Sequence, residues 1–213
     1  MAINSLVSFF VSTALVTLLC LLFFTAIWEQ RYLPGAAPLA FLILSISWWI
    51  CGSMMEDVAK TDALRILWAK LQYFAIETAP VLWLLFALEY TRLINRLPIW
   101  LRRNLGWLWI FPAFTILVVL VNEKHWLIWS QIIRVGEILR YDHGVWFWIA
   151  AGYNYILMTS GALILFWMIS RAPFANVMQT AILILGAFLP FIANILYLFK
   201  LLPPSIGDLT PTA

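Results

Sequence analysis

Long runs of apolar residues constrain this chain more than any other feature. An α-helix rises about 1.5 Å per residue, so ~20 apolar residues cross the ~30 Å hydrocarbon core of a bilayer. Six segments approach or exceed this length with few charged residues. They are residues 6–28, 36–55, 64–90, 105–121, 145–170 and 174–199. The sequence therefore predicts an all-α fold, a polytopic transmembrane helix bundle in which six spans are visible.

The composition excludes a soluble globular protein. Of the 213 residues, 64% are hydrophobic and 11% are charged, whereas soluble domains carry about 25% charged residues. A net charge of +3 would favour nucleic acid as a partner of a soluble protein, but in a membrane protein basic residues mark topology, so no nucleic-acid partner is predicted. The first run has no basic segment before it and exceeds the ~7–15 apolar residues of a signal peptide, so we interpret it as a retained helix.

The basic residues predict the orientation. The connection after the third run reads TRLINRLPIWLRRN and contains no acid. Its arginines are Arg92, Arg96, Arg102 and Arg103. Short loops rich in arginine remain in the cytoplasm. This places the N-terminus, the acidic stretch 56–62 and the longer loop 122–144 outside.

Tryptophans gather near the predicted ends of the runs. This pattern is typical of an aromatic belt at headgroup depth, and an aromatic ligand cage is the alternative. The residues are Trp28, Trp48, Trp49, Trp100, Trp107, Trp109, Trp126, Trp129, Trp146 and Trp148.

The third run contains ionisable residues, which are costly inside a membrane and are therefore functional candidates. Glu77 lies about halfway along it, and Lys70 and Tyr73 precede it on the same helical face. Pro80 deprives the Ile76 carbonyl of its helical donor. One hypothesis is that Lys70, Tyr73 and Glu77 line a polar cavity that opens outward. The alternative is that Glu77 is protonated, or paired with a neighbouring helix, and only holds the bundle together.

Two further runs carry polar residues at a similar depth. Tyr153 and Asn154 lie in the outer half of the fifth run, and Asn194 and Tyr197 lie in that of the sixth. Hydrogen bonding between helices would explain each of them, but their shared depth with Lys70 favours a pocket. The predicted ligand-binding residues are Lys70, Tyr73, Glu77, Tyr153, Asn154, Asn194 and Tyr197.

Other chemistry is not predicted. Glu89 is expected to pair with Arg92 or Arg96 at the helix end. His125 and His143 have no evident third ligand, and no CxxC, HExxH or Walker sequence occurs. Cys20 and Cys51 lie in apolar runs and do not indicate disulfides. We therefore expect no catalytic residues, no metal and no cofactor.

Several motifs, in order, resemble a known family. The acidic outer end of the second run, an arginine entry to the third, an inner proline and the sequence FALEYT are followed by Asn122 with His125-Trp126, and then by an aromatic fifth run. The matching residues are Glu56, Arg65, Pro80, 86–91, 146–147, 153–155 and 207–211. Over residues 5–213 the chain resembles the seven-helix N-terminal sensor region of bacterial histidine kinases, which is also found ahead of diguanylate cyclases.

The resemblance implies a single sensor-like domain over residues 1–213, in the bacterial inner membrane, with a seventh helix and a cytoplasmic output domain after 208–211. The sequence ends at Ala213, so we expect a fragment of a longer protein. The implied function is to bind a small molecule from the outer side and signal to a kinase or cyclase domain. The implied partners are membrane lipid, that ligand, the output domain and a second copy in a homodimer. The chain itself is not expected to be an enzyme. The alternative is a transporter or channel component, for which the inner half offers few polar residues.

Overall fold

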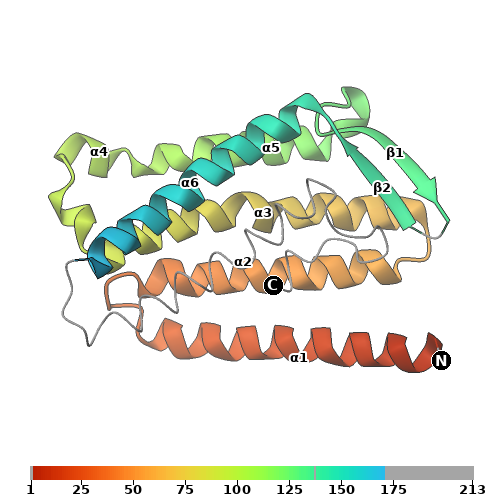
Figure 1. Ribbon diagram of the computed structural model, residues 1–213, viewed down its shortest axis with the longest axis horizontal. Helices are drawn as coiled ribbons and strands as arrows, with labels where there is room; N and C mark the ends of the chain where they lie inside the picture. Colours follow the sequence, from red (N-terminus) through yellow and green to blue (C-terminus); the bar gives the residue numbers. More distant parts are fainter. Residues whose placement is uncertain (1, 137, 171–213) are drawn as a thin grey trace.

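The computed structural model describes residues 2–136 and 138–170, and these residues form a helical bundle with one small hairpin (Figure 1). The long helices are α1 (Ala2–Glu29), α2 (Ala36–Val58), α3 (Asp62–Tyr90), α5 (Ile110–Leu120) and α6 (Val145–Ile169). Short elements join them: η1 (Leu93–Arg96), α4 (Ile99–Arg103), η2 (Leu105–Trp109), η3 (Asn122–Lys124), β1 (Trp129–Val135) and β2 (Ile138–His143). The predicted all-α bundle is confirmed. The predicted run 174–199, with Asn194 and Tyr197, lies outside the described residues.

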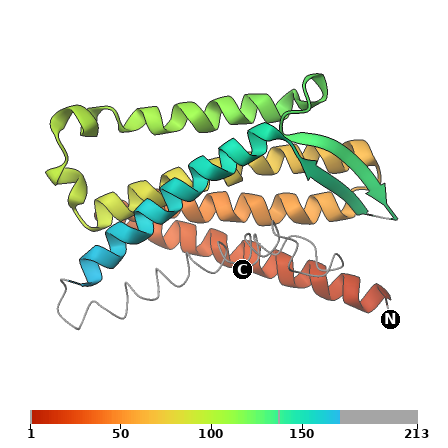
Figure 2. The same ribbon diagram turned by 45° about the horizontal axis from the view of Figure 1, so that its top comes forward.

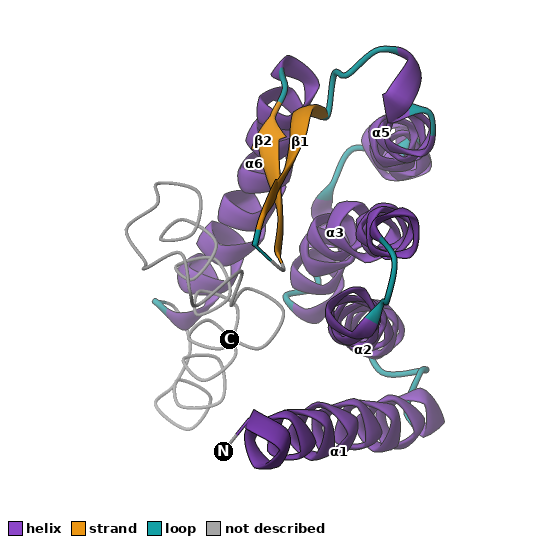
Figure 3. Cartoon of the chain, turned by 90° about the vertical axis from the view of Figure 1, so that its right-hand side faces the viewer, coloured by secondary structure: helices purple, strands orange, loops and turns teal. Residues whose placement is uncertain are grey.

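Helix α3 is the centre of the described bundle. Helices α1, α2, α3 and α5 lie in a row, and α6 crosses α3 on one side of that row (Figures 2 and 3). Helix α3 contacts α2, α5 and α6, and it contributes the largest share of buried residues. Of the described helices, α2, α3 and α6 are long and apolar enough to cross a membrane, while the apolar segments Ala14–Glu29 and Leu105–Leu120 are shorter.

The start of α3 follows from its sequence. Thr61 is the N-cap, and its hydroxyl accepts a hydrogen bond from the backbone N–H of Leu64 at 3.4 Å. Asp62 places a negative charge in the first turn, where the helix dipole favours it. The helix then continues through Pro80 to Tyr90. One continuous helix therefore carries Lys70, Tyr73 and Glu77.

The fourth predicted span is shorter than expected. The run 105–121 begins as the 3₁₀ helix η2, and only its last part, α5, is α-helical. Pro112 explains the change, because it has no N–H to bond the carbonyl of residue 108. Pro112 is the third residue of α5, within the first turn, where a missing donor is tolerated.

The loop 122–144 contains a β-hairpin, which was not predicted. Strands β1 and β2 pair antiparallel, with Val135 opposite Ile138 and Trp129 opposite His143. Gly136 at the turn has a positive φ of 65°, which suits glycine, and β1 is rich in β-branched residues.

The hairpin lies at the end of the bundle where α2 connects to α3 (Figure 1). Arg134 on β1 pairs with Asp62 at 3.2 Å, and the Tyr141 hydroxyl on β2 donates to Glu56 Oε1 at 2.8 Å. The α1–α2 connection and α4 lie at the opposite end. The two ends of the described bundle thus differ in charge, one with paired acidic and basic residues and one rich in arginine.

Trp129 corrects the interpretation of the tryptophans. Its side chain is only 3% exposed, and it packs edge-on against Tyr73 with ring centroids 5.8 Å apart. Trp129 is therefore a core residue and not part of a belt. Trp100 and Trp107 are 66% and 70% exposed at the arginine-rich end, as interfacial anchors should be.

Candidate functional site

Glu77 and Asn154 meet at the contact between α3 and α6. Glu77 is 1% exposed, and its Oε1 accepts a hydrogen bond from the Asn154 side-chain amide at 3.2 Å. Two of the predicted site residues, on helices far apart in sequence, are thus in direct contact. One oxygen of Glu77, Oε1, is therefore bonded to a neighbouring helix, as the structural alternative for Glu77 expects.

The other oxygens of this pair have no donor within the described residues. Glu77 Oε2 and Asn154 Oδ1 are both buried, and neither has a hydrogen-bond partner there. A buried acceptor without a donor costs roughly 1–3 kcal/mol. Asn154 Oδ1 is an acceptor, and Glu77 Oε2 is an acceptor while its carboxyl group is ionised, so a group that satisfied both in that state would have to bring N–H or O–H donors.

Lys70 is already engaged by its surroundings. Its ammonium donates to Glu123 at 2.5 Å and to the Leu120 carbonyl at 3.0 Å, and the residue is 8% exposed. Burial opposes the charged form of Glu123, but the hydrogen bond and charge of Lys70 prevail and hold the pKa of Glu123 below its ordinary value. Glu123 belongs to the loop 122–144 and was not among the predicted site residues. Two of the three N–H donors of Lys70 are occupied, and the Glu123 carboxylate balances its charge.

Tyr73 precedes Glu77 on α3, and Tyr153 precedes Asn154 on α6. Tyr73 is 6% exposed and packs in a core cluster with Trp129 and Ile128 from the hairpin segment. Tyr153 donates its hydroxyl to the Leu108 carbonyl at 2.7 Å and stacks on Phe111 with centroids 4.3 Å apart. Tyr153 therefore ties α6 to the start of α5, while its neighbour Asn154 contacts α3.

A second polar cluster joins α2, α3 and β2 near the hairpin end of the bundle. Glu56 accepts from the Gln72 amide at 2.6 Å through one oxygen and from the Tyr141 hydroxyl through the other. Gly52 makes room for this contact, because a Cβ there would lie 2.7 Å from Gln72 Cγ. Glu56 was noticed only as an acidic helix end, and no spacing rule could have paired it with Tyr141, 85 residues away.

Asn122 fixes the entry to the hairpin. It is fully buried, its Oδ1 accepts from the backbone N–H groups of Ile128 and Trp129, and its Nδ2 donates to the Trp129 carbonyl. This set of bonds holds the chain between α5 and β1. Asn122 is thus a structural residue of the outer loop.

His125 and His143 both make contacts within or next to the loop 122–144. The Nδ1 of His125 accepts from the Leu127 backbone N–H at 3.0 Å, so its Nε2 carries the proton and donates to the Val118 carbonyl. His143 stacks on Phe147 at 3.7 Å between ring centroids. In the described part of the chain no group of three or more histidine, cysteine or acidic residues could hold a metal ion.

The expected ion pair of Glu89 with Arg92 or Arg96 is wrong. Glu89 instead accepts a hydrogen bond from the Gly35 backbone N–H at 3.2 Å. Arg92 has a φ of 56° and leaves the helical path, so the i, i+3 spacing no longer brings it over Glu89. The carboxylate therefore joins the C-terminal end of α3 to the α1–α2 turn.

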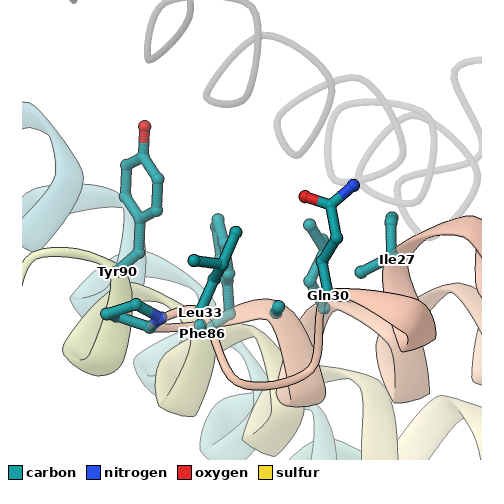
Figure 4. Close-up of a pocket in the computed structure, with 9 residues that line it drawn as sticks. Ile27, Gln30, Leu33, Phe86 and Tyr90 are labelled. Carbon is teal, nitrogen blue, oxygen red and sulfur yellow. The ribbon is translucent and has the colours of Figure 1, made fainter.

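A shallow pocket of about 210 Å³ lies beside that turn (Figure 4). Its lining is largely apolar, and it includes Ile27, Gln30, Leu33, Phe86 and Tyr90. Of the predicted ligand-binding residues, the five in the described part of the chain do not line it. This pocket and the Glu77–Asn154 pair are therefore separate places in the fold.

The comparison with protein families decides the membership of the chain. The family model for the N-terminal 7TM region of histidine kinase matches residues 10–213. The chain belongs to this family. No curated protein and no solved structure matches it.

The 7TM region of histidine kinases is a sensory input module and not their catalytic part. The recognition made from Glu56, Pro80 and the FALEYT sequence is confirmed. The apolar helices α2, α3 and α6 agree with a multi-pass membrane protein. The Glu77–Asn154 contact therefore lies inside the membrane part of a 7TM sensory region.

Proposed function

We propose that this 7TM region binds a small molecule from the outer side and signals to a cytoplasmic kinase or cyclase output domain. The observation that carries the proposal is the buried pair Glu77–Asn154, whose two remaining acceptor oxygens have no donor in the described residues. Ionisable groups inside membranes are costly and are usually retained for function. The proposed binding residues are Lys70, Tyr73, Glu77, Tyr153 and Asn154, joined by Asn194 and Tyr197 outside the described part.

The open atoms favour a ligand that donates hydrogen bonds. Lys70 is paired with Glu123, so it would not attract a carboxylate or phosphate. Glu77 and Asn154 offer acceptors beside aromatic residues of α3 and α6. A small, partly apolar amine or alcohol fits this chemistry better than an acid.

The signal would pass along α6. The outer end of α6 continues directly from β2, and β2 is bound to α2 through Tyr141 and Glu56. A ligand that separated or drew together α3 and α6 would change the tilt of α6 and move its inner end. Such a shift requires that the ligand bind one packing more tightly than the other.

Transport is less well supported. A permeation path needs polar side chains through the inner half of the bundle, yet the buried residues of α3 beyond Pro80 are mainly apolar: Val81, Leu82, Trp83, Leu84, Phe86, Ala87 and Leu88. The one indole N–H among them is already bonded to the Met158 carbonyl at 3.0 Å.

The test uses ligands that share a skeleton and differ in one group. Phenethylamine, phenethyl alcohol and phenylacetate are added to the purified chain, and the midpoint of thermal unfolding is measured. We expect the amine or the alcohol, but not the acid, to stabilise the protein, and Asn154→Ala to abolish the effect. In a fusion to a kinase domain, the same compound should change autophosphorylation. Stabilisation without such a change would leave binding but refute signalling.

The orientation is tested by labelling. We propose that the N-terminus and the hairpin face outward and that Arg96 faces the cytoplasm, because α4 and its neighbours carry four arginines and no acidic residue. In a background with Cys20 and Cys51 replaced by serine, a cysteine introduced at position 134 should react with an impermeant maleimide in intact cells. A cysteine at position 96 should react only after lysis. The reverse pattern would invert the topology.

A further inference from the structure

The connection between α3 and α5, residues 91–109, has two different sides. One side is half-buried and packs against Val81, Leu84, Leu88 and Leu157 through Leu93, Ile94, Leu97, Leu105 and Leu108. The other side is exposed and carries four arginines together with Ile99, Trp100 and Trp107. We call residues 91–109 the basic connection. Because its apolar side is anchored on the core, its arginines and tryptophans are held at a fixed place on the surface.

The arginines of the basic connection differ from three of the cations at the hairpin end. Those three, Lys70, Arg134 and Arg140, are each paired with a carboxylate. Within the described residues, Arg92, Arg96, Arg102 and Arg103 have no ion-pair partner. The basic connection therefore presents a positive charge that this part of the chain does not neutralise.

Exposed apolar groups accompany this charge. Ile99 is 86% exposed and Trp100 is 66% exposed, and both stand beside Arg102 and Arg103 in α4. Isoleucine and tryptophan so exposed are unfavourable in water but favourable at the boundary between headgroups and acyl chains. Arginine next to such anchors can donate bidentate hydrogen bonds to phosphate.

Arg92 occupies a backbone position that glycine would occupy more readily. Its φ of 56° is in the left-handed region, directly after the end of α3. Helices commonly end on glycine in this conformation, because other residues are strained there. Glycine would adopt this backbone conformation more readily than arginine. What arginine adds at this position is its positive charge.

We propose that the basic connection binds the headgroups of anionic phospholipids, with Ile99 and Trp100 inserted at the boundary of the acyl chains. The four arginines supply the positive charge, and the packed side sets their depth. The site would make this sensory region sensitive to the anionic lipid content of the leaflet that it faces. It does not depend on the ligand proposed at Glu77.

The experiment measures lipid selectivity in nanodiscs, which expose both faces of the membrane. The chain is reconstituted in equal parts phosphatidylcholine and phosphatidylglycerol. Spin-labelled phosphatidylglycerol and phosphatidylcholine are compared for the fraction immobilised on the protein. We expect the wild type to prefer phosphatidylglycerol, and each arginine removed to lower this preference about fivefold, which is ~1 kcal/mol per basic residue at an anionic surface. High salt should weaken the preference.

Two variants and one control make the outcome decisive. The double variant Arg102→Gln/Arg103→Gln removes two exposed charges, and Arg92→Gly removes one while relieving the left-handed strain. Arg134→Gln/Arg140→Gln makes the same change in charge at the hairpin and should retain the preference. Unchanged selectivity in both variants of the basic connection would overturn the proposal. An equal loss in the hairpin control would also overturn it, since net charge alone would then explain the preference. If the variants of the basic connection lose stability equally in phosphatidylcholine and in phosphatidylglycerol, the connection binds a protein segment and not lipid, and the proposal is wrong.

Discussion

Glu77 on α3 accepts a hydrogen bond from Asn154 on α6 at 3.2 Å, across 77 residues of sequence. Farther along the same two helices, the Trp83 indole N–H donates to the Met158 carbonyl at 3.0 Å, where a Cβ on Gly161 would lie 2.5 Å from the indole nitrogen. These two contacts place α6 against α3 at two depths. Any motion of α6 relative to α3 must alter one or both of them.

The Glu77–Asn154 bond should contribute measurably to stability. Asn154→Ala removes the donor to a buried carboxyl group, so we expect a loss of about 1 kcal/mol, the usual range for polar contacts between membrane helices. Glu77→Gln retains an acceptor for the Asn154 amide and should cost less. The midpoint of thermal unfolding in detergent measures both changes.

A double-mutant cycle isolates this bond. Glu77→Ala, Asn154→Ala and the combined variant should show a coupling free energy of about 0.5–1.5 kcal/mol. Asn95→Ala, at an exposed asparagine of the basic connection, is the control and should be neutral. Simple additivity of the two alanine variants would mean that the bond contributes nothing.

Gly161 should be intolerant of a larger side chain. The added methyl group of Gly161→Ala would meet the Trp83 indole and push α6 away from α3, at a cost of about 1–3 kcal/mol. Gly152 lies on the same helix with no atom within 4 Å of a built Cβ. Gly152→Ala is therefore the matched control, expected to be neutral or slightly stabilising. Similar unfolding midpoints for the two variants would contradict the close packing of α6 on Trp83.

The Lys70–Glu123 pair should make stability fall in acid. The folded-state pKa of Glu123 is lowered, mainly because the bond from Lys70 outweighs the cost of burial. A depressed pKa contributes stability that is present above the unfolded value, ~4.3 for glutamate, and is lost as the pH falls through the folded value. The side chain of Glu123 is 52% exposed, so solvent screening keeps the contribution modest.

Glu123→Gln removes this acid-labile contribution. We expect a loss of about 1 kcal/mol at neutral pH, because Lys70 keeps only the Leu120 carbonyl, and a flatter dependence of the unfolding midpoint on pH below 5. Asp142→Asn, in the exposed pair with Arg140, should change neither quantity by much. An unaltered acid dependence in Glu123→Gln would assign the effect to another carboxyl group.

Tyr141 should hold the hairpin on the bundle. Tyr141→Phe removes the hydroxyl that donates to Glu56 while Gln72 still donates to the same carboxylate. We expect faster hydrogen exchange of the β2 amides with little change in those of α3. Tyr32→Phe, at a tyrosine 83% exposed, is the control. If β2 exchanges at the wild-type rate, the hairpin does not depend on this contact for its attachment.

Three local features differ from the predictions made from the sequence, each because of the backbone conformation. The run 105–121 has the composition of a span, but its first part is a 3₁₀ segment, and the α-helix that begins just before Pro112 is short. The hairpin 129–143 was hidden inside a loop because two short strands give a weak signal beside long apolar runs. Arg92 lies outside the helical path, so Glu89 does not form the predicted ion pair and accepts a hydrogen bond from the Gly35 N–H.

The sequence by itself determined the membrane class, the helical architecture, the positions of α2, α3 and α6 and the membership of the family, because apolar length and the order of motifs are properties of the chain alone. Only the tertiary structure decided which polar groups meet. Glu56 with Tyr141, Lys70 with Glu123 and Glu77 with Asn154 are pairs separated by 53 to 85 residues. Such partners depend on how helices rotate and pack against one another, and helical periodicity within one segment contains no information about the segment that faces it.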